Sequence, residues 1–309
     1  MSNNRVNGRL HNPLMHRVTV LLIKPMLLTP IFRTILSVAT VITMSVGLSA
    51  CNPDKANATK QSTDNNNAVP TETIRIAAAA NLAEVLPNII KRYQSENNLP
   101  ASHIEVSYAS SGKLYAQIQA GAPYDLFLSA NQDFPAKWVT ERPVTAPDSL
   151  PFTYTQGQLS VYSATKSMAQ LNPARLTTLL TTQTDSKVTI ASPVLAPYGA
   201  SAQAYLQAQN IYETLDRQKR IIQAENIGQA FQYAHTGNVD YGFVAQSQVV
   251  AIHAAPDQFY LLPPDTYPAI LQDGILLSDA VTAAAFSDYL RSATAQAYFA
   301  KAGYLALKP

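Results

Sequence analysis

Two short stretches of small residues each follow a predicted strand and precede a predicted helix. Residues 78–82 (Ala-Ala-Ala-Asn-Leu) follow the apolar run 74–76, and residues 109–114 (Ala-Ser-Ser-Gly-Lys-Leu) follow the run 104–108. A helix N-terminus presents unpaired backbone N–H groups and the positive end of the helix dipole. Such a turn can bind an anion without any Lys or Arg side chain. Together the two turns predict a protein that holds an oxyanion through hydrogen bonds.

The residue types in these stretches also have an ordinary structural explanation. Asn81 and Ser111 stand where a helix starts, and Asn and Ser are favoured at helix N-caps in any protein. Lys113 follows Ser111 closely, but a lysine in a helix is more typical of a solvated face than of an anion contact. The site hypothesis therefore depends on further turns of the same kind elsewhere in the chain.

Apolar runs that alternate with segments of helical period indicate an α/β fold with a parallel or mixed sheet covered on both faces. Strands are predicted over residues 74–78, 104–108, 126–128, 159–162, 188–191, 241–244, 259–262 and 270–276. Helices are predicted over residues 82–93, 114–118, 200–209, 227–235, 280–290 and 294–302.

Three further segments stand where a ligand site of such a fold is expected. Ligands of open α/β sheets bind beyond the carboxyl ends of the strands, at helix N-termini. Segments 196–200 and 225–228 each open a predicted helix, and segment 241–245 is a strand that ends in the small residue Ala245. Several clusters of backbone N–H groups would therefore converge on one point if two lobes faced each other.

The first fifty residues have the pattern of a leader. They contain five basic residues and no acidic one, and their apolar stretch 35–46 is short for a membrane span. Residues 48–51, Leu-Ser-Ala-Cys, resemble the lipobox of bacterial lipoproteins, whose cysteine is acylated and becomes the new N-terminus. We therefore predict a signal peptide at residues 1–50 and lipidation of Cys51. The alternative is an uncleaved anchor helix that starts near Leu21.

Removal of the leader changes what the net charge implies. Five of the 22 Lys and Arg residues and none of the 20 Asp and Glu residues precede Cys51, so the mature chain carries a net charge of about −3. The basic balance of the full chain therefore gives no argument for nucleic-acid binding. A single cysteine excludes a disulfide within the chain. Residues 51–72 are polar without an apolar period, which predicts a flexible tether ahead of a part long enough for two modest lobes.

The order of these motifs resembles the molybdate-binding proteins of bacterial ABC transporters over residues 73–309. Residues 121–130, Gly-Ala-Pro-Tyr-Asp-Leu-Phe-Leu-Ser-Ala, resemble the family's GAPxDLFxSA segment, and residues 298–304 resemble its C-terminal helix. The resemblance implies a type II periplasmic-binding-protein fold, in which two α/β lobes with mixed sheets flanked by helices are joined by a hinge that the chain crosses twice.

The resemblance also implies where the lobes divide and which residues bind the ligand. Lobe one is expected over residues 73–152 and 256–309, and lobe two over residues 153–255. In the family a tetrahedral oxyanion lies between the lobes and accepts hydrogen bonds from hydroxyls and backbone amides of both. Carried over to this chain, the ligand residues are Asn81, Ser111, Tyr198, Ile227 and Ala245.

These residues depart from the family pattern at several positions. Asn81 stands where many members have Ser, and Tyr198 stands where others have Ala. Ile227 would donate its backbone N–H at a position that is often Val. Ala245 replaces a Tyr of some members, which removes one phenolic donor. Tyr198 is a candidate replacement for that donor.

The function implied by the resemblance is that of a receptor that delivers molybdate or tungstate to an ABC permease. The ligand is a complete oxyanion, so neither a free metal cation nor a cofactor is expected. The chain would be a monomer on the periplasmic side of the cell envelope, attached to a membrane by the lipid on Cys51. Neutral donors suit a dianion, because burial of an unmatched charge is prohibitive. Cavity size would separate molybdate from the smaller sulfate.

Two other functions stay open. The same fold could hold sulfate, phosphate or a phosphonate, although a phosphate site favours Arg and none falls in the candidate turns. An envelope hydrolase is the other alternative, but the chain has no Gly-x-Ser-x-Gly nucleophile elbow, and Ser111 has no evident His or acid partner. His103, His235 and His253 are widely spaced and show no metal-ligand pattern. We therefore expect a binding protein and not an enzyme.

Overall fold

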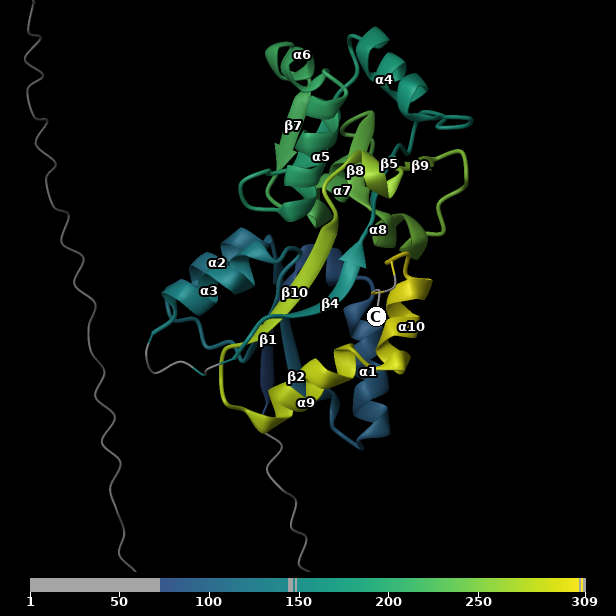
Figure 1. The fold of residues 1–309 in the computed structure, drawn as a ribbon. Helices are drawn as coiled ribbons and strands as arrows, with labels where there is room; N and C mark the ends of the chain where they lie inside the picture. The colour runs from purple at the N-terminus through teal and green to yellow at the C-terminus, as the bar shows by residue number, and fades with distance from the viewer. Residues whose placement is uncertain (1–72, 144–146, 148, 306, 308–309) are drawn as a thin grey trace, which may run out of the picture. The chain divides into compact units, whose positions relative to one another are not determined.

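The structure, a computed structural model, describes residues 73–143, 147, 149–305 and 307. The expected signal peptide at 1–50, the expected lipidation of Cys51 and the expected tether at 51–72 lie outside the described residues. The described part forms two α/β lobes, each built around one five-stranded mixed sheet (Figure 1). This confirms the predicted fold class.

The sheet of lobe one has the strand order β2-β1-β3-β10-β4. Its strands are β1 (Ile74–Ala79), β2 (Ile104–Ala109), β3 (Leu126–Leu128), β4 (Phe152–Gly157) and β10 (Ile270–Leu276). β1 pairs in parallel with β2 and β3, whereas β10 pairs antiparallel with β3 and β4. The carboxyl ends of β1, β2 and β3 therefore lie at one edge of the sheet.

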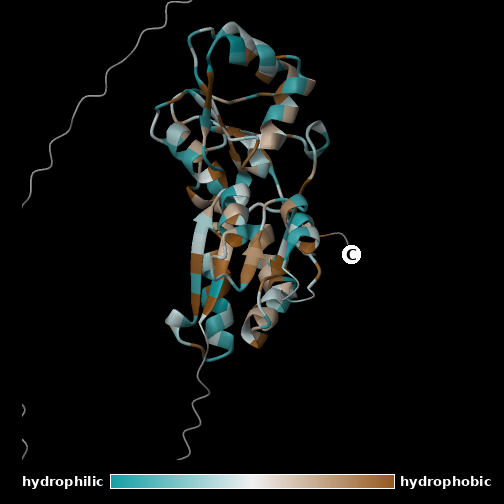
Figure 2. Cartoon of the chain, turned by 90° about the vertical axis from the view of Figure 1, so that its left-hand side faces the viewer, coloured by the Kyte–Doolittle hydropathy of each residue, from teal (hydrophilic) through white to brown (hydrophobic). Residues whose placement is uncertain are grey.

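Side chains alternate along β1, so each face of this sheet has its own hydrophobic core. Ile76 and Ala78 belong to the core that contains α1 (Leu86–Glu96), α9 (Val281–Leu290) and α10 (Ala293–Lys301). Ala77 belongs to the opposite core, with α2 (Ser111–Gln119) and α3 (Asp133–Glu141). Helices therefore cover both faces, and Figure 2 shows hydrophobic residues concentrated on the central strands.

The sheet of lobe two has the strand order β7-β6-β8-β5-β9. Its strands are β5 (Leu159–Tyr162), β6 (Val188–Ala191), β7 (Ile221–Ala224), β8 (Tyr241–Ala245) and β9 (Phe259–Leu261). Its helices are α4 (Pro173–Thr182), α5 (Pro197–Ala208), α6 (Tyr212–Arg217), α7 (Ile227–His235) and α8 (Gln246–Ala251). The parallel strands β6, β7 and β8 are followed by α5, α7 and α8, so the N-termini of these helices gather at one edge.

The chain crosses between the lobes twice. Gln158 alone separates β4 from β5, and residues 262–269, which contain the 3-10 helix η3 (Pro264–Thr266), separate β9 from β10. β4 therefore belongs to lobe one and β9 to lobe two. The boundaries predicted after residues 152 and 255 both lie several residues too early. At the first crossing, the chain passes from one sheet to the other within a single extended segment at Gln158, without a polar loop to mark the boundary. At the second, β9 lies beyond residue 255 but still pairs with β5 of lobe two.

Candidate functional site

A small cavity lies between the lobes at the point where helices from both begin. Its walls contain the first residues of α2 and of the 3-10 helix η1 (Ala80–Leu82) on lobe one, and of α5 and α7 on lobe two. Ala130, from the loop after β3, is also part of the wall. The cavity volume is about 10 Å³, which is space for one compact group. This is about the space of one water molecule, so a peptide or a sugar has no room in this arrangement, and a small ion would enter only with a slight outward movement of the wall.

Four of the five predicted ligand residues lie in this wall, namely Asn81, Ser111, Tyr198 and Ile227. They stand at four different helix N-termini, which follow the carboxyl ends of β1, β2, β6 and β7. The first N–H groups of a helix have no partner within the helix, and the helix dipole places its positive end there. None of the described residues in the wall is charged. The cavity can therefore stabilise a negative charge with neutral donors alone.

Lobe one contributes two hydroxyl groups to the wall. Ser111 Oγ accepts a hydrogen bond from the backbone nitrogen of Ala130 at 3.0 Å, so its own proton is available to the cavity. Ser110, the N-cap of α2, has a buried Oγ without a hydrogen-bond partner among the described residues. An unpaired buried hydroxyl costs stability unless a ligand or a water binds it. Ser110 is thus a candidate ligand residue that the sequence prediction missed, although it directly precedes the predicted Ser111 in the same turn.

Lobe two contributes backbone N–H groups. α5 begins with Pro197, which has no N–H, so Tyr198 carries the first N–H of that helix. Asn226 caps α7 through its side chain, which accepts from the backbone nitrogen of Gln229 at 3.0 Å. Ile227 is the first residue of α7, and the cap binds Gln229 instead, so the N–H of Ile227 has no partner within the helix. Both helices present donors at the cavity.

The side chains of Asn81 and Tyr198 meet at Gln272, a fully buried residue of β10. Asn81 Nδ2 donates to Gln272 Oε1 at 2.9 Å and to the Tyr304 hydroxyl at 3.0 Å. Gln272 Nε2 donates to the Tyr198 hydroxyl at 3.3 Å. The sequence prediction missed Gln272 and Tyr304, because Gln272 is 191 residues from Asn81 in the chain and only the fold brings them together.

Burial keeps the phenols at this site neutral. Removal from water disfavours the ionised form of a tyrosine. It raises the pKa of Tyr198 well above the ordinary value and raises the pKa of Tyr304 to about 12. Both side chains therefore keep their protons at physiological pH and can act as hydrogen-bond donors.

The structure does not bring Ala245 into the cavity wall. Ala245 ends β8 in a fully buried position, and its backbone nitrogen donates to Gln248 Oε1 at 3.0 Å. Gln248 in turn donates through Nε2 to the carbonyl oxygen of Ile227 at 3.1 Å. Ala245 thus offers neither a free N–H nor a polar side chain, and the predicted ligand contact has no support in the geometry. Its position instead links β8 to the start of α7.

Contacts across the cleft hold the two lobes close together. The backbone nitrogen of Gly112 in α2 donates to the carbonyl oxygen of Leu195, just before α5, at 2.8 Å. Lys113 Nζ and Glu225 Oε1, also from opposite lobes, form an ion pair at 2.8 Å. Lys113 is half exposed and is not part of the cavity wall, which agrees with the reading of it as a solvated lysine.

Other features of the described residues do not compete with this cavity. A larger hollow of about 590 Å³ lies beside Trp138 and Leu277, but no residue of lobe two lines it. The described residues contain no group of three or more His, Cys, Asp or Glu side chains that could hold a metal ion. Within the same residues, no helix has the length and apolar character needed to cross a membrane.

Comparisons with known proteins agree with the fold. The family model described as bacterial extracellular solute-binding protein matches residues 74–305. The molybdate-binding protein ModA of Rhodobacter capsulatus is 34% identical over 232 residues, which cover 74% of this chain and 86% of that protein. ModA of Azotobacter vinelandii is 30% identical over 235 residues, which cover 75% of this chain and 89% of that protein.

A solved structure extends the agreement to three dimensions. The periplasmic molybdate-binding protein of Azotobacter vinelandii superposes with a TM-score of 0.67 at 26% identity, covering 76% of this chain and 100% of that chain. These relatives are solute-binding proteins, which confirms the expectation of a binding protein and not an enzyme. From the family match over most of its length and its identity with these relatives, the chain belongs to the bacterial extracellular solute-binding proteins.

Proposed function

We propose that this chain is the receptor of an ABC importer and that it binds molybdate or tungstate in the cavity between its lobes. The observation that carries the proposal is the convergence of four helix N-termini from both lobes on one small cavity without a charged wall residue. Relatives that are named molybdate-binding proteins support the choice of anion. An ion that contacts both lobes stabilises the closed arrangement, because the open one loses half of the contacts.

The donors in the wall suit a fully ionised tetrahedral anion. Backbone N–H groups of Ser111, Tyr198 and Ile227 and the hydroxyls of Ser110 and Ser111 are placed to donate to oxygens of the ligand. A hydrogen bond to a charged group contributes about 1.5–3 kcal/mol. The five bonds from these donors support binding in the micromolar range or tighter after the cost of association. Binding of this kind needs no cofactor and no free metal cation.

A thermal-shift and calorimetry panel tests the anion. The mature chain with Cys51→Ser, which cannot be acylated, is titrated with molybdate, tungstate, sulfate and phosphate at equal concentration. A ligand that binds only the native state raises the melting temperature. We expect a rise with molybdate and tungstate, and a stoichiometry of one. A rise with sulfate or phosphate and none with molybdate or tungstate would assign the site to another oxyanion.

The lipid anchor is a second part of the proposal. It rests on the Leu-Ser-Ala-Cys sequence at residues 48–51 and on the single cysteine of the chain. Acylated Cys51 would hold a monomeric receptor at a membrane, on the side where an extracellular solute-binding protein meets its permease. Metabolic labelling with tritiated palmitate should mark the wild-type protein and not the Cys51→Ser variant. Equal labelling of the two, or none of either, would remove the anchor from the proposal.

A further inference from the structure

Asn81, a residue of the cavity wall, carries an unpaired buried polar atom. Its Oδ1 is buried without a hydrogen-bond partner among the described residues, while Nδ2 donates to Gln272 and Tyr304. An unpaired buried carbonyl oxygen costs stability, and next to an oxyanion it is repulsive. The two ends of a side-chain amide have nearly the same shape, so the hydrogen-bond network decides which end points where.

The neighbours of Asn81 permit a second arrangement in which Asn81 and Gln272 turn their amides together. Gln272 Nε2 then donates to Asn81 Oδ1 and to the Tyr154 hydroxyl, across the separations of 2.9 and 3.1 Å at which Gln272 Oε1 now accepts. Gln272 Oε1 accepts from the Tyr198 hydroxyl at 3.3 Å. The Tyr154 hydroxyl keeps its hydrogen bond to the carbonyl oxygen of Ser129 at 2.8 Å.

Tyr304 and Ser247 complete this second arrangement. The Tyr304 hydroxyl lies 2.7 Å from the main-chain oxygen of Asn81 and 3.0 Å from its side-chain amide. It can donate to Asn81 Oδ1, because Ser247 Oγ donates to the main-chain oxygen of Asn81 at 3.2 Å. Oδ1 then has partners, and Asn81 Nδ2 occupies the place of the unpaired oxygen as a free donor.

We propose that Gln272 is the positioning residue of the anion site: turned together with Asn81, it directs Asn81 Nδ2 to the bound anion and fixes the Tyr198 hydroxyl. Gln272 suits this role because it is fully buried on lobe one and hydrogen-bonds Tyr198 of lobe two. The inference rests on the proposed function and deepens it by naming the residue that orients one of the donors. With Asn81 Oδ1 turned inward, the Asn81 side chain presents a donor and no acceptor to the anion.

The test compares two glutamines of lobe one that differ in what they touch. Gln272→Met removes the amide and keeps the approximate length of the side chain. The matched control is Gln296→Met, because Gln296 Nε2 donates to the carbonyl oxygens of Tyr154 and Leu290, away from the cavity. Calorimetry with molybdate on the mature Cys51→Ser protein should show affinity weakened about tenfold or more in Gln272→Met. The control should stay within about twofold of the parent.

A double-mutant cycle separates positioning from general destabilisation. If Gln272 fixes the Tyr198 hydroxyl, the double variant Gln272→Met/Tyr198→Phe loses less affinity than the product of the two single losses. If Gln272 is merely structural, its substitution lowers the melting temperature, and the two losses multiply. Multiplying losses, or an affinity of Gln272→Met within about twofold of the parent, would overturn the inference and leave the proposed function intact. Absence of binding of any tetrahedral oxyanion by the parent protein would overturn the proposed function itself.

A spectroscopic measurement on the parent protein covers the case in which Gln272→Met does not fold. The side-chain N–H resonances of Asn81 are identified in a nitrogen–proton correlation spectrum by their absence in Asn81→Ser. Addition of molybdate should shift one of the two Asn81 protons strongly downfield, because it enters a charge-assisted hydrogen bond. Unshifted Asn81 resonances at saturating molybdate would show that Nδ2 does not face the anion.

Discussion

The backbone nitrogen of Gly112 and the carbonyl oxygen of Leu195 lie 2.8 Å apart, although the two residues belong to different lobes. Gly112 directly follows Ser111 in α2, and Leu195 stands just before α5. A Cβ atom on Gly112 would lie 3.1 Å from both the Cα and the carbonyl oxygen of Leu195. The missing side chain therefore lets the lobes approach to hydrogen-bond distance directly beside the proposed anion site.

Gly112→Ala should weaken ligand binding by loosening the closed arrangement. The added methyl group meets backbone atoms that cannot move aside as a flexible side chain can. A loss of about 1 kcal/mol of closure corresponds to about fivefold in affinity for molybdate. Calorimetry measures the effect, and Ala116→Ser, at an exposed position of the same helix, is the control. Equal affinity in Gly112→Ala and in the control would show that this contact does not govern closure.

Ser111→Ala should lower the affinity for molybdate by more than about tenfold, because one charge-assisted hydrogen bond is lost. A smaller loss of stability is also expected, since Ser111 Oγ accepts from the backbone nitrogen of Ala130. Ser107→Ala, at an exposed position of β2, serves as the control in calorimetry and in thermal unfolding. Unchanged affinity in Ser111→Ala would remove this hydroxyl from the site.

Lys113→Ala should change the affinity far less than Ser111→Ala does. Lys113 pairs with Glu225 across the cleft, but its side chain is 50% exposed and that of Glu225 is 38% exposed. Exposed ion pairs contribute about 0–1 kcal/mol, so a loss of about threefold or less is expected at physiological salt. Titration at low and high salt measures it. A loss comparable to that of Ser111→Ala would indicate that Lys113 contacts the anion.

The stability of the protein should depend on pH through its buried tyrosines only in the alkaline range. Burial raises the pKa of Tyr304 to about 12, above the value near 10 expected in the unfolded chain. The stability contributed by the neutral phenol is therefore fully present below about pH 10 and is lost as pH rises towards about 12. Urea unfolding followed by circular dichroism should show this decline, and Tyr304→Phe should reduce it. A decline of equal size in Tyr304→Phe would assign it to other groups.

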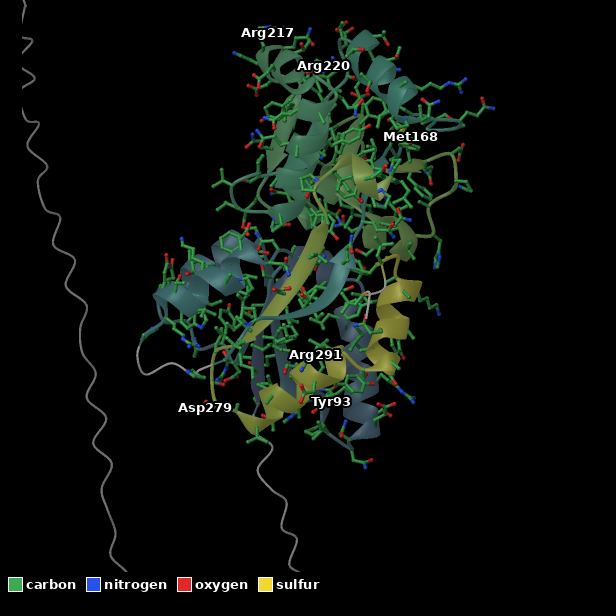
Figure 3. The ribbon with its side chains drawn as sticks, viewed as in Figure 1. Tyr93, Met168, Arg217, Arg220, Asp279 and Arg291 are labelled. Atoms are coloured by element: carbon green, nitrogen blue, oxygen red, sulfur yellow. The ribbon has the colours of Figure 1, made fainter. Side chains whose placement is uncertain are left out.

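Arg220→Met should destabilise the fold without weakening the binding of molybdate by the native protein. Arg220 is 1% exposed, and Figure 3 labels it in lobe two near the exposed Arg217. Its Nε donates to the carbonyl oxygen of Ser186 at 2.8 Å, and its Nη2 donates to that of Leu180 and to Ser186 Oγ, both at 2.7 Å. Loss of these bonds should lower the free energy of unfolding by about 3 kcal/mol or more.

Arg217→Met is the matched control for this stability experiment. Its side chain is exposed, so the substitution should change the free energy of unfolding by about 0.5 kcal/mol or less. Urea unfolding of the two variants compares them directly. Similar midpoints for Arg220→Met and Arg217→Met would show that the buried guanidinium contributes no net stability.

All eight strands predicted from the apolar runs are present in the structure, but the prediction missed β4 and β7. In β4, the polar residues Thr153, Thr155 and Gln156 interrupt the apolar pattern, and the strand exists because β10 pairs with it. In β7, the polar residue Gln223 limits the apolar run to two residues, Ile221 and Ile222. Both strands form because they pair with strands that are distant in sequence, and the local pattern of apolar residues cannot predict such pairing.

The same distinction separates the parts of the candidate site. Asn81 and Ser111 stand where a strand leads directly into a helix start, and this local pattern can be recognised in a single sequence. Tyr198 and Ile227 also stand at helix starts, but their choice as ligand residues came from the family resemblance. The role of Gln272 follows from contacts with residues on both lobes, and nothing in its own strand indicates it. Ala245 fits the local pattern, but Gln248 uses its N–H, and only the structure shows that competition.

The two connections between the lobes differ greatly in length, one residue at Gln158 against eight at residues 262–269. Gln158 is also tied through its Nε2 to the carbonyl oxygen of Gly303 at 2.7 Å. Each residue supplies only two soft backbone torsions, so we expect the short connection to act as the hinge and the long one to adjust through its many torsions. Release of a bound solute would then involve rotation about Gln158, and a stiffer residue at this position should slow the exchange of solute without altering any group that touches it.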